Sequence, residues 1–317
     1  RMELEKFPVI GFHKPYSVDN LITDSAAGAT AFACGVKTYN GAIGLTADTL
    51  PTPSIIEEVE MQGMATGLVV TSTVNHATPA AFYAHQKVRI LFDQIAADLL
   101  NTEIDFVVGG GKRYFDNREI DDRNLYEELQ EKGYLVTDYM QGELRQMGID
   151  SERNFIYFTG DTDPPAAGVG RNYLPYASKK ALHFLEEHSD KGFFLLIEGS
   201  QIDWACHNQK DHWAIDELKD FDRAIGEVLE YAKADGNTLV IVTADHETGG
   251  MSINEGSKIN RLKTGFTSNG HTGAMVPVFA YGPSADLFGG IYENTDIHKK
   301  MRQALGLAAN STSALND

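Results

Sequence analysis

The sequence predicts an α/β fold in which a mostly parallel central sheet carries helices on both faces. Its strand-like segments, such as 67–73, 193–197 and 238–243, are nearly continuous apolar runs, and they alternate with helical segments. Strands of this kind are typical of parallel sheets buried on both sides. At 317 residues and 42% hydrophobic content the chain can form one large α/β unit or two domains. We expect a single domain over residues 1–317.

The N-terminal half contains regular elements that follow each other closely. Residues 7–12 fit a short edge strand, and the small residues 25–34 fit a helix that begins after the capping residue Asp24. Spacing and stop signals predict the next elements in this order: helix 54–62, strand 67–73, helix 88–100 and strand 106–108.

The C-terminal half begins with an irregular stretch. Residues 112–172 are charged and broken by Gly and Pro, so we expect a surface excursion with a short helix near 124–132. Regular patterns then predict helix 174–188, strand 193–197, amphipathic helix 211–233, strand 238–243, strand 276–281 near the sheet edge and helix 296–305.

Composition excludes several classes of protein. A net charge of −18 argues against a nucleic-acid-binding surface, because the phosphates would be repelled. The two cysteines, Cys34 and Cys206, are too few for a disulfide framework. No apolar run is long enough for a transmembrane helix, and the charged start does not resemble a signal peptide, so we expect a mature form or an internal start.

Ser25 stands at the start of the predicted small-residue helix. A helix N-terminus offers unpaired N–H groups and a positive dipole, which favour an anion such as phosphate. The Ser25 hydroxyl could attack phosphorus there while the amides hold the phosphoryl oxygens. The alternative is that Ser25 only caps the helix.

Histidines and carboxylates follow two of the predicted strands, and a further histidine precedes a third strand. Because active sites in open α/β sheets lie beyond the carboxyl ends of strands, Glu198, Asp203, Asp245 and His246 should share one crevice. Mixed His and carboxylate ligands suit zinc, and oxygen ligands suit magnesium. The residues are Glu198, Asp203 and His207 after strand 193–197, Asp245 and His246 after strand 238–243, and His271 before strand 276–281.

The order of these motifs resembles the alkaline phosphatase family. The resemblance rests on residues 23–31 with 35–41, and on 76–80, 198–207, 243–246 and 271–273. It covers nearly the whole chain except 112–172. It implies a metal-dependent phosphomonoesterase with a three-layer α/β sandwich, two zinc ions and one magnesium ion. It also implies a homodimer exported to the periplasm or beyond.

The resemblance assigns a role to each matching residue. Ser25 is the expected nucleophile that becomes phosphoserine, Arg89 the phosphate-binding arginine, and Asp24 the carboxylate that orients it. The expected metal ligands are Asp203, His207 and His271 for the first zinc, Asp245 and His246 for the second zinc, and Thr78 and Glu198 for magnesium. Metal coordination makes a serine hydroxyl nucleophilic, and paired metals stabilise an in-line displacement. A solvated helix charge is the alternative for Arg89.

The chain departs from the family pattern in two places. His76 and Trp204 stand where the best-studied bacterial branch of the family has an aspartate and a lysine. This exchange of residues should alter magnesium affinity and phosphate release. The alternative for Trp204 is that it is a packing residue. An N-terminal strand with an Asp-Gly turn is also missing before Ser25. We therefore expect weaker binding of the second zinc and of magnesium. Two alternatives remain: a phosphodiesterase or sulfatase of the same superfamily, and an inactive metal- or phosphate-binding fragment.

Overall fold

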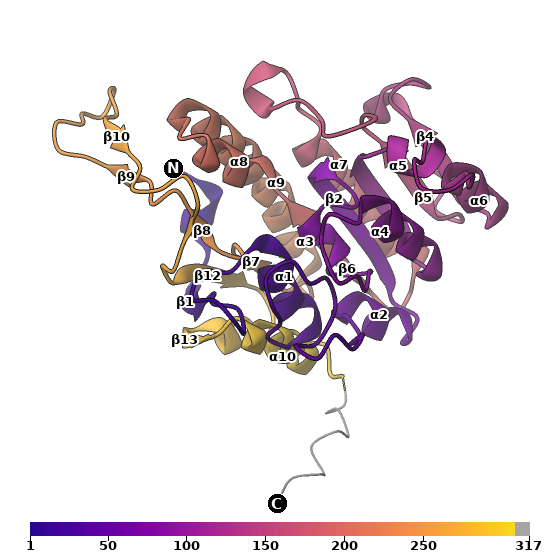
Figure 1. Ribbon diagram of the computed structural model, residues 1–317, viewed down its shortest axis with the longest axis horizontal. Coiled ribbons are helices and arrows are strands. Elements are labelled where there is room, and N and C mark those ends of the chain that lie inside the picture. The colour runs from indigo at the N-terminus through magenta and orange to yellow at the C-terminus, as the bar shows by residue number, and fades with distance from the viewer. Residues whose placement is uncertain (308–317) are drawn as a thin grey trace, which may run out of the picture.

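The computed structural model describes residues 1–307, and its strands form two main sheets (Figure 1). The larger sheet has the order β4-β5-β3-β2-β6, and all its neighbours are parallel. Its strands are β2 (Ala65–Thr73), β3 (Phe106–Gly110), β4 (Leu135–Asp138), β5 (Phe155–Phe158) and β6 (Phe193–Glu198). The apolar runs 67–73, 106–108 and 193–197 therefore form strands as predicted.

The smaller sheet is mixed and has the order β13-β1-β12-β7. β1 pairs antiparallel with β12 and parallel with β13, and β12 pairs antiparallel with β7. Its strands are β1 (Val9–Lys14), β7 (Val240–Val242), β12 (Val276–Tyr281) and β13 (Gly290–Glu293). The prediction that 7–12 is an edge strand is wrong, because β13 covers the outer side of β1. The strand 276–281 lies next to the edge strand β7, in agreement with its predicted place near the sheet edge.

The prediction of a surface excursion over 112–172 is wrong for its central part. β4 and β5 extend the parallel sheet, and all four residues of β5 are buried. The apolar tetrapeptide of β5 pairs with β3 through Phe155 and Phe106, whose rings lie 5.3 Å apart. Short strands flanked by charged loops have too little pattern to be separated from loops by sequence alone.

Helices cover both faces of the parallel sheet (Figure 1). Alternate residues of β2 enter two different cores: Leu68 and Val70 lie in the core with α1, α2 and α10, whereas Val69 packs with α7. This alternation is the mark of a sheet buried on both sides. The helices are α1 (Ser25–Cys34), α2 (Ile55–Glu60), α3 (Ala77–Ala80), α4 (Phe92–Asp98), α5 (Arg113–Asp116), α6 (Leu125–Glu131), α7 (Leu174–His188), α8 (Gln201–His207), α9 (Asp211–Asp235) and α10 (Thr295–Ala304).

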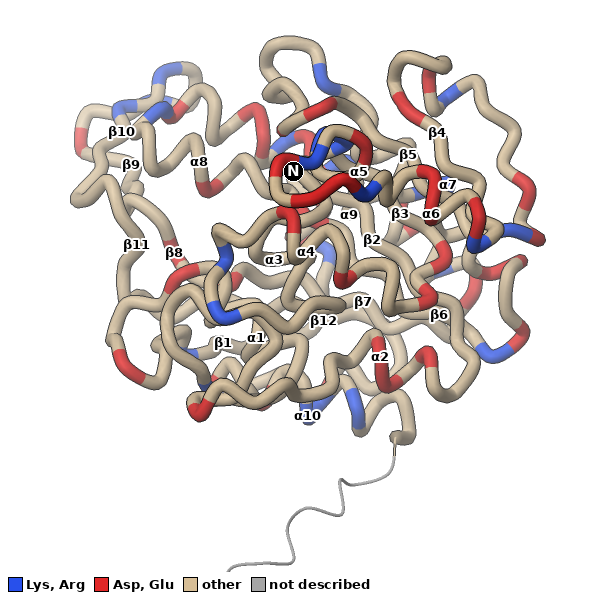
Figure 2. Tube along the Cα trace, turned by 45° about the vertical axis from the view of Figure 1, so that its right-hand side comes forward, with Lys and Arg blue, Asp and Glu red and all other residues tan. Residues whose placement is uncertain are grey.

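Two short antiparallel ladders follow β7. β8 (Glu247–Thr248) pairs with β11 (His271–Thr272), and β9 (Ser252–Ile253) pairs with β10 (Thr264–Gly265) in a hairpin that projects from the body (Figure 1). Acidic residues are distributed over the surface rather than gathered in one patch (Figure 2). None of the helices within residues 1–307 has the length and apolarity needed to cross a membrane.

Candidate active site

Ser25 begins α1 and is nearly buried, with 6% of its surface exposed. Asp24 caps the helix, because its Oδ1 accepts the N–H of Ala27 at 3.0 Å. The Oγ of Ser25 lies 3.1 Å from Nε2 of His246, which belongs to the loop after β7. The helix N-terminus and the β7 loop therefore bring a hydroxyl and an imidazole into hydrogen-bond contact.

Small residues let α1 approach this loop closely. A Cβ atom at Gly28 would lie 3.0 Å from Cβ of Asp245 and 3.2 Å from its carbonyl oxygen. Such distances leave no room for a side chain without a shift of the backbone. Gly28 thus fixes the spacing between Ser25 and the Asp245–His246 pair.

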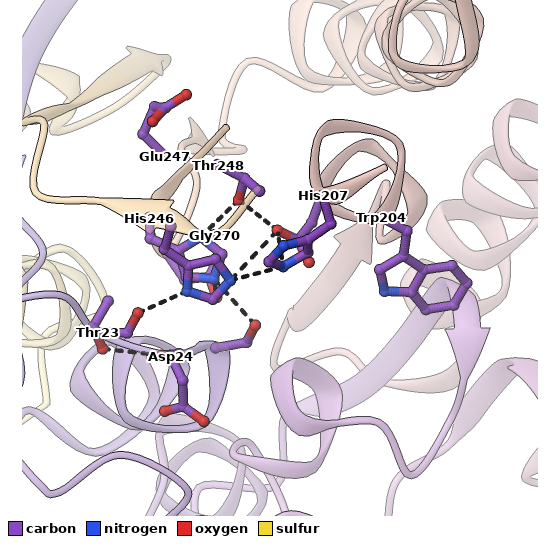
Figure 3. A network of polar contacts seen from close by, with 12 residues as sticks. Thr23, Asp24, Trp204, His207, His246, Glu247, Thr248 and Gly270 are labelled. Carbon is purple, nitrogen blue, oxygen red and sulfur yellow. Dashed lines mark hydrogen bonds and ion pairs between the residues drawn. The ribbon is translucent and has the colours of Figure 1, made fainter. Parts of the chain in front are cut away.

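Asp203, His207 and His271 form a cluster suited to a metal ion. Their ligand atoms all lie within 4.8 Å of one another. Asp203 and His207 lie on one face of α8, as expected for residues four apart on a helix, and His271 comes from β11. Figure 3 shows His207 and His246 approaching the site from opposite sides. Oδ1 of Asp203 lies 3.3 Å from Nε2 of His207 and 3.6 Å from Nε2 of His271.

The hydrogen bonds of the two histidines favour a cation between them. Nδ1 of His207 lies 2.6 Å from the carbonyl oxygen of Asn269, and Nδ1 of His271 lies 2.7 Å from that of Thr23. A carbonyl oxygen can only accept, so each Nδ1 carries the proton and each Nε2 presents a lone pair. The two Nε2 atoms are 3.0 Å apart. Facing lone pairs beside a carboxylate match the donor set of zinc.

Asp245 and His246 form a second pair beside this cluster. Oδ2 of Asp245 lies 3.2 Å from Nε2 of His246, and the His246 ring stacks on that of His271 with centroids 3.5 Å apart. Burial would raise the pKa of Asp245, but the His246 imidazole outweighs it and holds that pKa below its ordinary value. Asp245 in turn raises the pKa of the buried His246, against the lowering effect of burial. Positive charge is therefore stabilised at this point.

Arg89 reaches the site from a loop. It was predicted to lie on helix 88–100, but α4 begins at Phe92, so the helical position is wrong. Its guanidinium donates to Oδ2 of Asp24 at 3.0 Å and lies 3.5 Å from Nε2 of His76. His76 meets Trp204 edge to face at 5.7 Å. Burial lowers the pKa of His76 to about 3, and the charge of Arg89 adds to this effect. His76 is therefore neutral.

Glu198 ends β6 and is half-buried. Burial raises the pKa of Glu198 to about 7, and the negative charge of Asp245 raises it further. Hydrogen bonds from the hydroxyls of Ser200 and Thr78 lower this pKa in part. Oγ of Ser200 donates to Oε2 of Glu198 at 2.5 Å. A half-buried carboxylate with hydroxyl neighbours and a second carboxylate nearby fits a divalent cation with oxygen ligands. The residue types at this position fit the expected magnesium ion.

Three side chains that sequence reasoning missed position this site. The Thr248 hydroxyl donates to Oδ1 of Asp203 and lies 3.2 Å from Nδ1 of His246. His13 on β1 contacts the carbonyl oxygen of Ala244 at 2.8 Å, and Asn40 accepts the N–H of Asp24 at 3.1 Å. Asn40 lies within the segment 35–41 that carries the family resemblance, whereas His13 and Thr248 lie outside the segments that carry it. The position of Thr248, two residues after His246, is the sequence feature that could have identified it as a residue of the site.

Comparison with known proteins is consistent with this arrangement. The family model described as alkaline phosphatase matches residues 1–264 and 255–307. The chain belongs to the alkaline phosphatase family. It is therefore an enzyme of the phosphomonoesterase class, as the sequence predicts.

Relatives and solved structures of the family match most of the chain. Alkaline phosphatase 4 of Bacillus subtilis is 34% identical over 89% of this chain and 76% of its own length. The alkaline phosphatase of Escherichia coli is 31% identical over 96% of this chain and 79% of its own length.

The structure of alkaline phosphatase from the Antarctic bacterium TAB5 matches this chain with a TM-score of 0.89 and 38% sequence identity. The match covers 98% of this chain and 91% of the TAB5 chain. A histidine-to-glutamate variant of the TAB5 enzyme is described with Mg bound in a site named M3.

Proposed function

We propose that the chain hydrolyses phosphate monoesters through a phosphoserine intermediate on Ser25, with two zinc ions and one magnesium ion. The observation that carries this proposal is the 3.1 Å contact between Ser25 Oγ and His246 at the start of α1, beside the Asp203–His207–His271 cluster. A nucleophile next to cation sites is the arrangement that phosphoryl transfer requires.

The residues divide among the proposed sites by the chemistry of their donors. Asp203, His207 and His271 would hold the first zinc, and Asp245 with His246 the second. Glu198 and Thr78 would hold magnesium, and a variant of the related TAB5 enzyme is described with Mg bound. When bound, these cations would lower the pKa of hydroxyl groups and stabilise charge on the attacking and leaving oxygens.

The chain's own groups position the ester for in-line displacement. The guanidinium of Arg89 binds two phosphoryl oxygens, and Asp24 orients it through the 3.0 Å ion pair. The N–H groups at the start of α1 face the same oxygens. Oγ of Ser25 attacks phosphorus, the P–O bond to the leaving alcohol breaks, and water then hydrolyses the phosphoserine.

His76 contacts the guanidinium of Arg89 and the ring of Trp204, so we expect His76 and Trp204 to act on the phosphate through the position of Arg89. Because His76 is neutral, it does not repel the guanidinium. In line with the resemblance, we also propose a homodimer exported to the periplasm or beyond.

Turnover with a general monoester tests the proposal. p-Nitrophenyl phosphate would be supplied at about pH 9 with zinc and magnesium, then after EDTA treatment, alongside a Ser25→Ala variant. We expect activity that both EDTA and the variant abolish. Hydrolysis that survives in folded Ser25→Ala would contradict the serine mechanism. Faster hydrolysis of a diester than of the monoester would favour a phosphodiesterase.

A further inference from the structure

His85 lies outside the candidate metal sites, and each of its two ring nitrogens contacts an oxygen atom. Nδ1 lies 2.7 Å from the carbonyl oxygen of Gly44, and Nε2 lies 3.1 Å from Oε1 of Glu57. A carbonyl oxygen and an ionised carboxylate can only accept hydrogen bonds. Both contacts are therefore hydrogen bonds only when both nitrogens carry a proton. The geometry favours the positively charged imidazole.

The groups around His85 favour the same protonated form. Burial would raise the pKa of Glu57, but hydrogen bonds from His85 and from the N–H of Ser54 hold that pKa below its ordinary value. The hydrogen bond with Glu57 raises the pKa of His85, burial opposes it, and the carbonyl of Gly44 and the charges of Glu57 and Asp98 raise this pKa further. His85 therefore keeps its proton to a higher pH than an ordinary histidine and loses it as the solution becomes alkaline.

The His85 ring connects two helices to its own loop. Glu57 belongs to α2, and Gly44 donates its N–H to Oγ1 of Thr30 in α1 at 3.0 Å. A Cβ atom at Gly44 would lie 2.7 Å from Nδ1 of His85 and 2.2 Å from the carbonyl oxygen of Ala84. Gly44 also has a φ of +60°, so glycine is required for this close approach.

Arg89 lies four residues after His85 in the loop 85–91, which we call the Arg89 loop. The start of this loop is held in place, because Gln86 exchanges two backbone hydrogen bonds with Ile43 at 2.9 and 3.0 Å. The residues on either side of Arg89 are exposed. The position of the guanidinium therefore depends on how firmly His85 and Gln86 hold the start of the loop.

We propose that His85 is a positioning residue for Arg89: its charged ring fixes the start of the Arg89 loop, and its deprotonation at alkaline pH loosens the loop and weakens phosphate binding. On deprotonation, one ring nitrogen turns a lone pair toward the oxygen of Glu57 or Gly44, and one hydrogen bond is lost. The proton leaves to solvent, which reaches the ring because the side chain is 24% exposed. The inference rests on the proposed role of Arg89 in phosphate binding.

Nuclear magnetic resonance of the imidazole nitrogens tests the first step without metal or turnover. The signals of His85 would be assigned from their loss in His85→Gln. We expect the ring to stay protonated to a higher pH than a free histidine, and Glu57→Gln to lower that pH. Hydrogen exchange of the Ile43 and Gln86 amides tests the second step. Their protection factors should fall as His85 loses its proton, and should be low at every pH in His85→Gln.

Inorganic phosphate is the probe for the effect on Arg89. Its Kd would be measured by calorimetry on the zinc- and magnesium-loaded chain at about pH 6.5, the ordinary pKa of histidine, and at about pH 9.5. Ionisation of phosphate itself is the same for every variant, so it cancels in a ratio of Kd values. We expect the Kd of His85→Gln to exceed that of the wild type about three- to tenfold near pH 6.5 and to equal it near pH 9.5.

His188→Gln is the matched control. Nδ1 of His188 lies 2.6 Å from the carbonyl oxygen of Ser151, and Nε2 lies 3.0 Å from Oδ1 of Asp105, so the ring meets the same two kinds of acceptor. His188 ends α7, and Asp105 directly precedes β3, at the opposite end of the strand from the candidate active site. This variant should leave the Kd of phosphate unchanged at both pH values.

Several outcomes would overturn the proposal. A Kd ratio of His85→Gln to wild type that is the same at both pH values would exclude the pH-dependent effect. Unchanged protection of Ile43 and Gln86 in His85→Gln would show that the ring does not hold the loop. An equal effect of His188→Gln on Kd would assign the change to general loosening of the fold. Absence of phosphate binding by the metal-loaded wild type would refute the proposed role of Arg89, whereas the hydrogen-exchange result would still decide whether His85 holds the loop.

Discussion

Replacing Gly28 by alanine sets two effects of known size against each other. Alanine is more favourable than glycine within a helix by about 1 kcal/mol. The added Cβ would meet Cβ of Asp245 at 3.0 Å and its carbonyl oxygen at 3.2 Å, so one backbone must move by a few tenths of an ångström. Overpacking of this kind costs about 1–3 kcal/mol. We expect Gly28→Ala to lower the free energy of unfolding by about 1 kcal/mol.

The same shift should reduce activity more than stability. Asp245 is adjacent to His246, which contacts Ser25. Misplacement of reacting groups by 1 Å can cost about a hundredfold in rate, so a smaller shift should cost about tenfold in kcat/KM. Urea unfolding and steady-state hydrolysis of p-nitrophenyl phosphate measure the two effects on the same preparation.

Gly226→Ala is the matched control for this prediction. Gly226 lies within α9, and an added Cβ would be 3.3 Å from Cγ of the flexible Glu3 side chain, which can move aside. We expect this variant to gain up to about 1 kcal/mol in stability with unchanged kcat/KM. If Gly28→Ala behaves like Gly226→Ala in both assays, the close approach of α1 to Asp245 does not constrain the site.

Three further changes test other parts of the site and the fold. Arg89→Lys keeps the charge but loses the planar pair of donors, so kcat/KM should fall about ten- to a hundredfold. The control Arg113→Lys, at the surface, should leave kcat/KM unchanged. Equal effects of the two substitutions would show that Arg89 does not bind the phosphate. Asp203→Asn should lower the zinc content measured by mass spectrometry, and an unchanged content would place zinc elsewhere. Burial raises the pKa of Glu60 to about 7, so its ionisation destabilises the fold as pH rises from about 4.5 through 7. Glu60→Gln should therefore raise the free energy of unfolding by about 2 kcal/mol near pH 8 and little near pH 5. The same gain in stability at both pH values would show that it does not come from the ionisation of Glu60.

Local patterns sufficed for the elements that position the catalytic groups. The start of α1 at Ser25 follows from a capping aspartate and a run of small residues, and helix 174–188 occupies the residues predicted for it. Asp203 and His207 share a helix face because they are four residues apart. The convergence of Glu198 and Asp245 was expected because both stand at the carboxyl ends of strands, although β6 and β7 belong to different sheets.

Features that depend on long-range pairing could not be predicted from local patterns. β1 and β12 have the alternation of edge strands, and their interior positions are set by β13 and β7, far away in the sequence. The buried β5 resembles a loop segment because it has four residues. His13 reaches the carbonyl of Ala244 across 231 positions, so no spacing rule could identify it.

Detection of phosphate on Ser25 is the most direct test of the proposed mechanism. The metal-loaded enzyme would be mixed with excess substrate, quenched in acid and digested for mass spectrometry. We predict a phosphorylated peptide containing Ser25 that is absent without substrate. Phosphate on another residue, or turnover in the folded Ser25→Ala variant at the wild-type rate, would contradict the account.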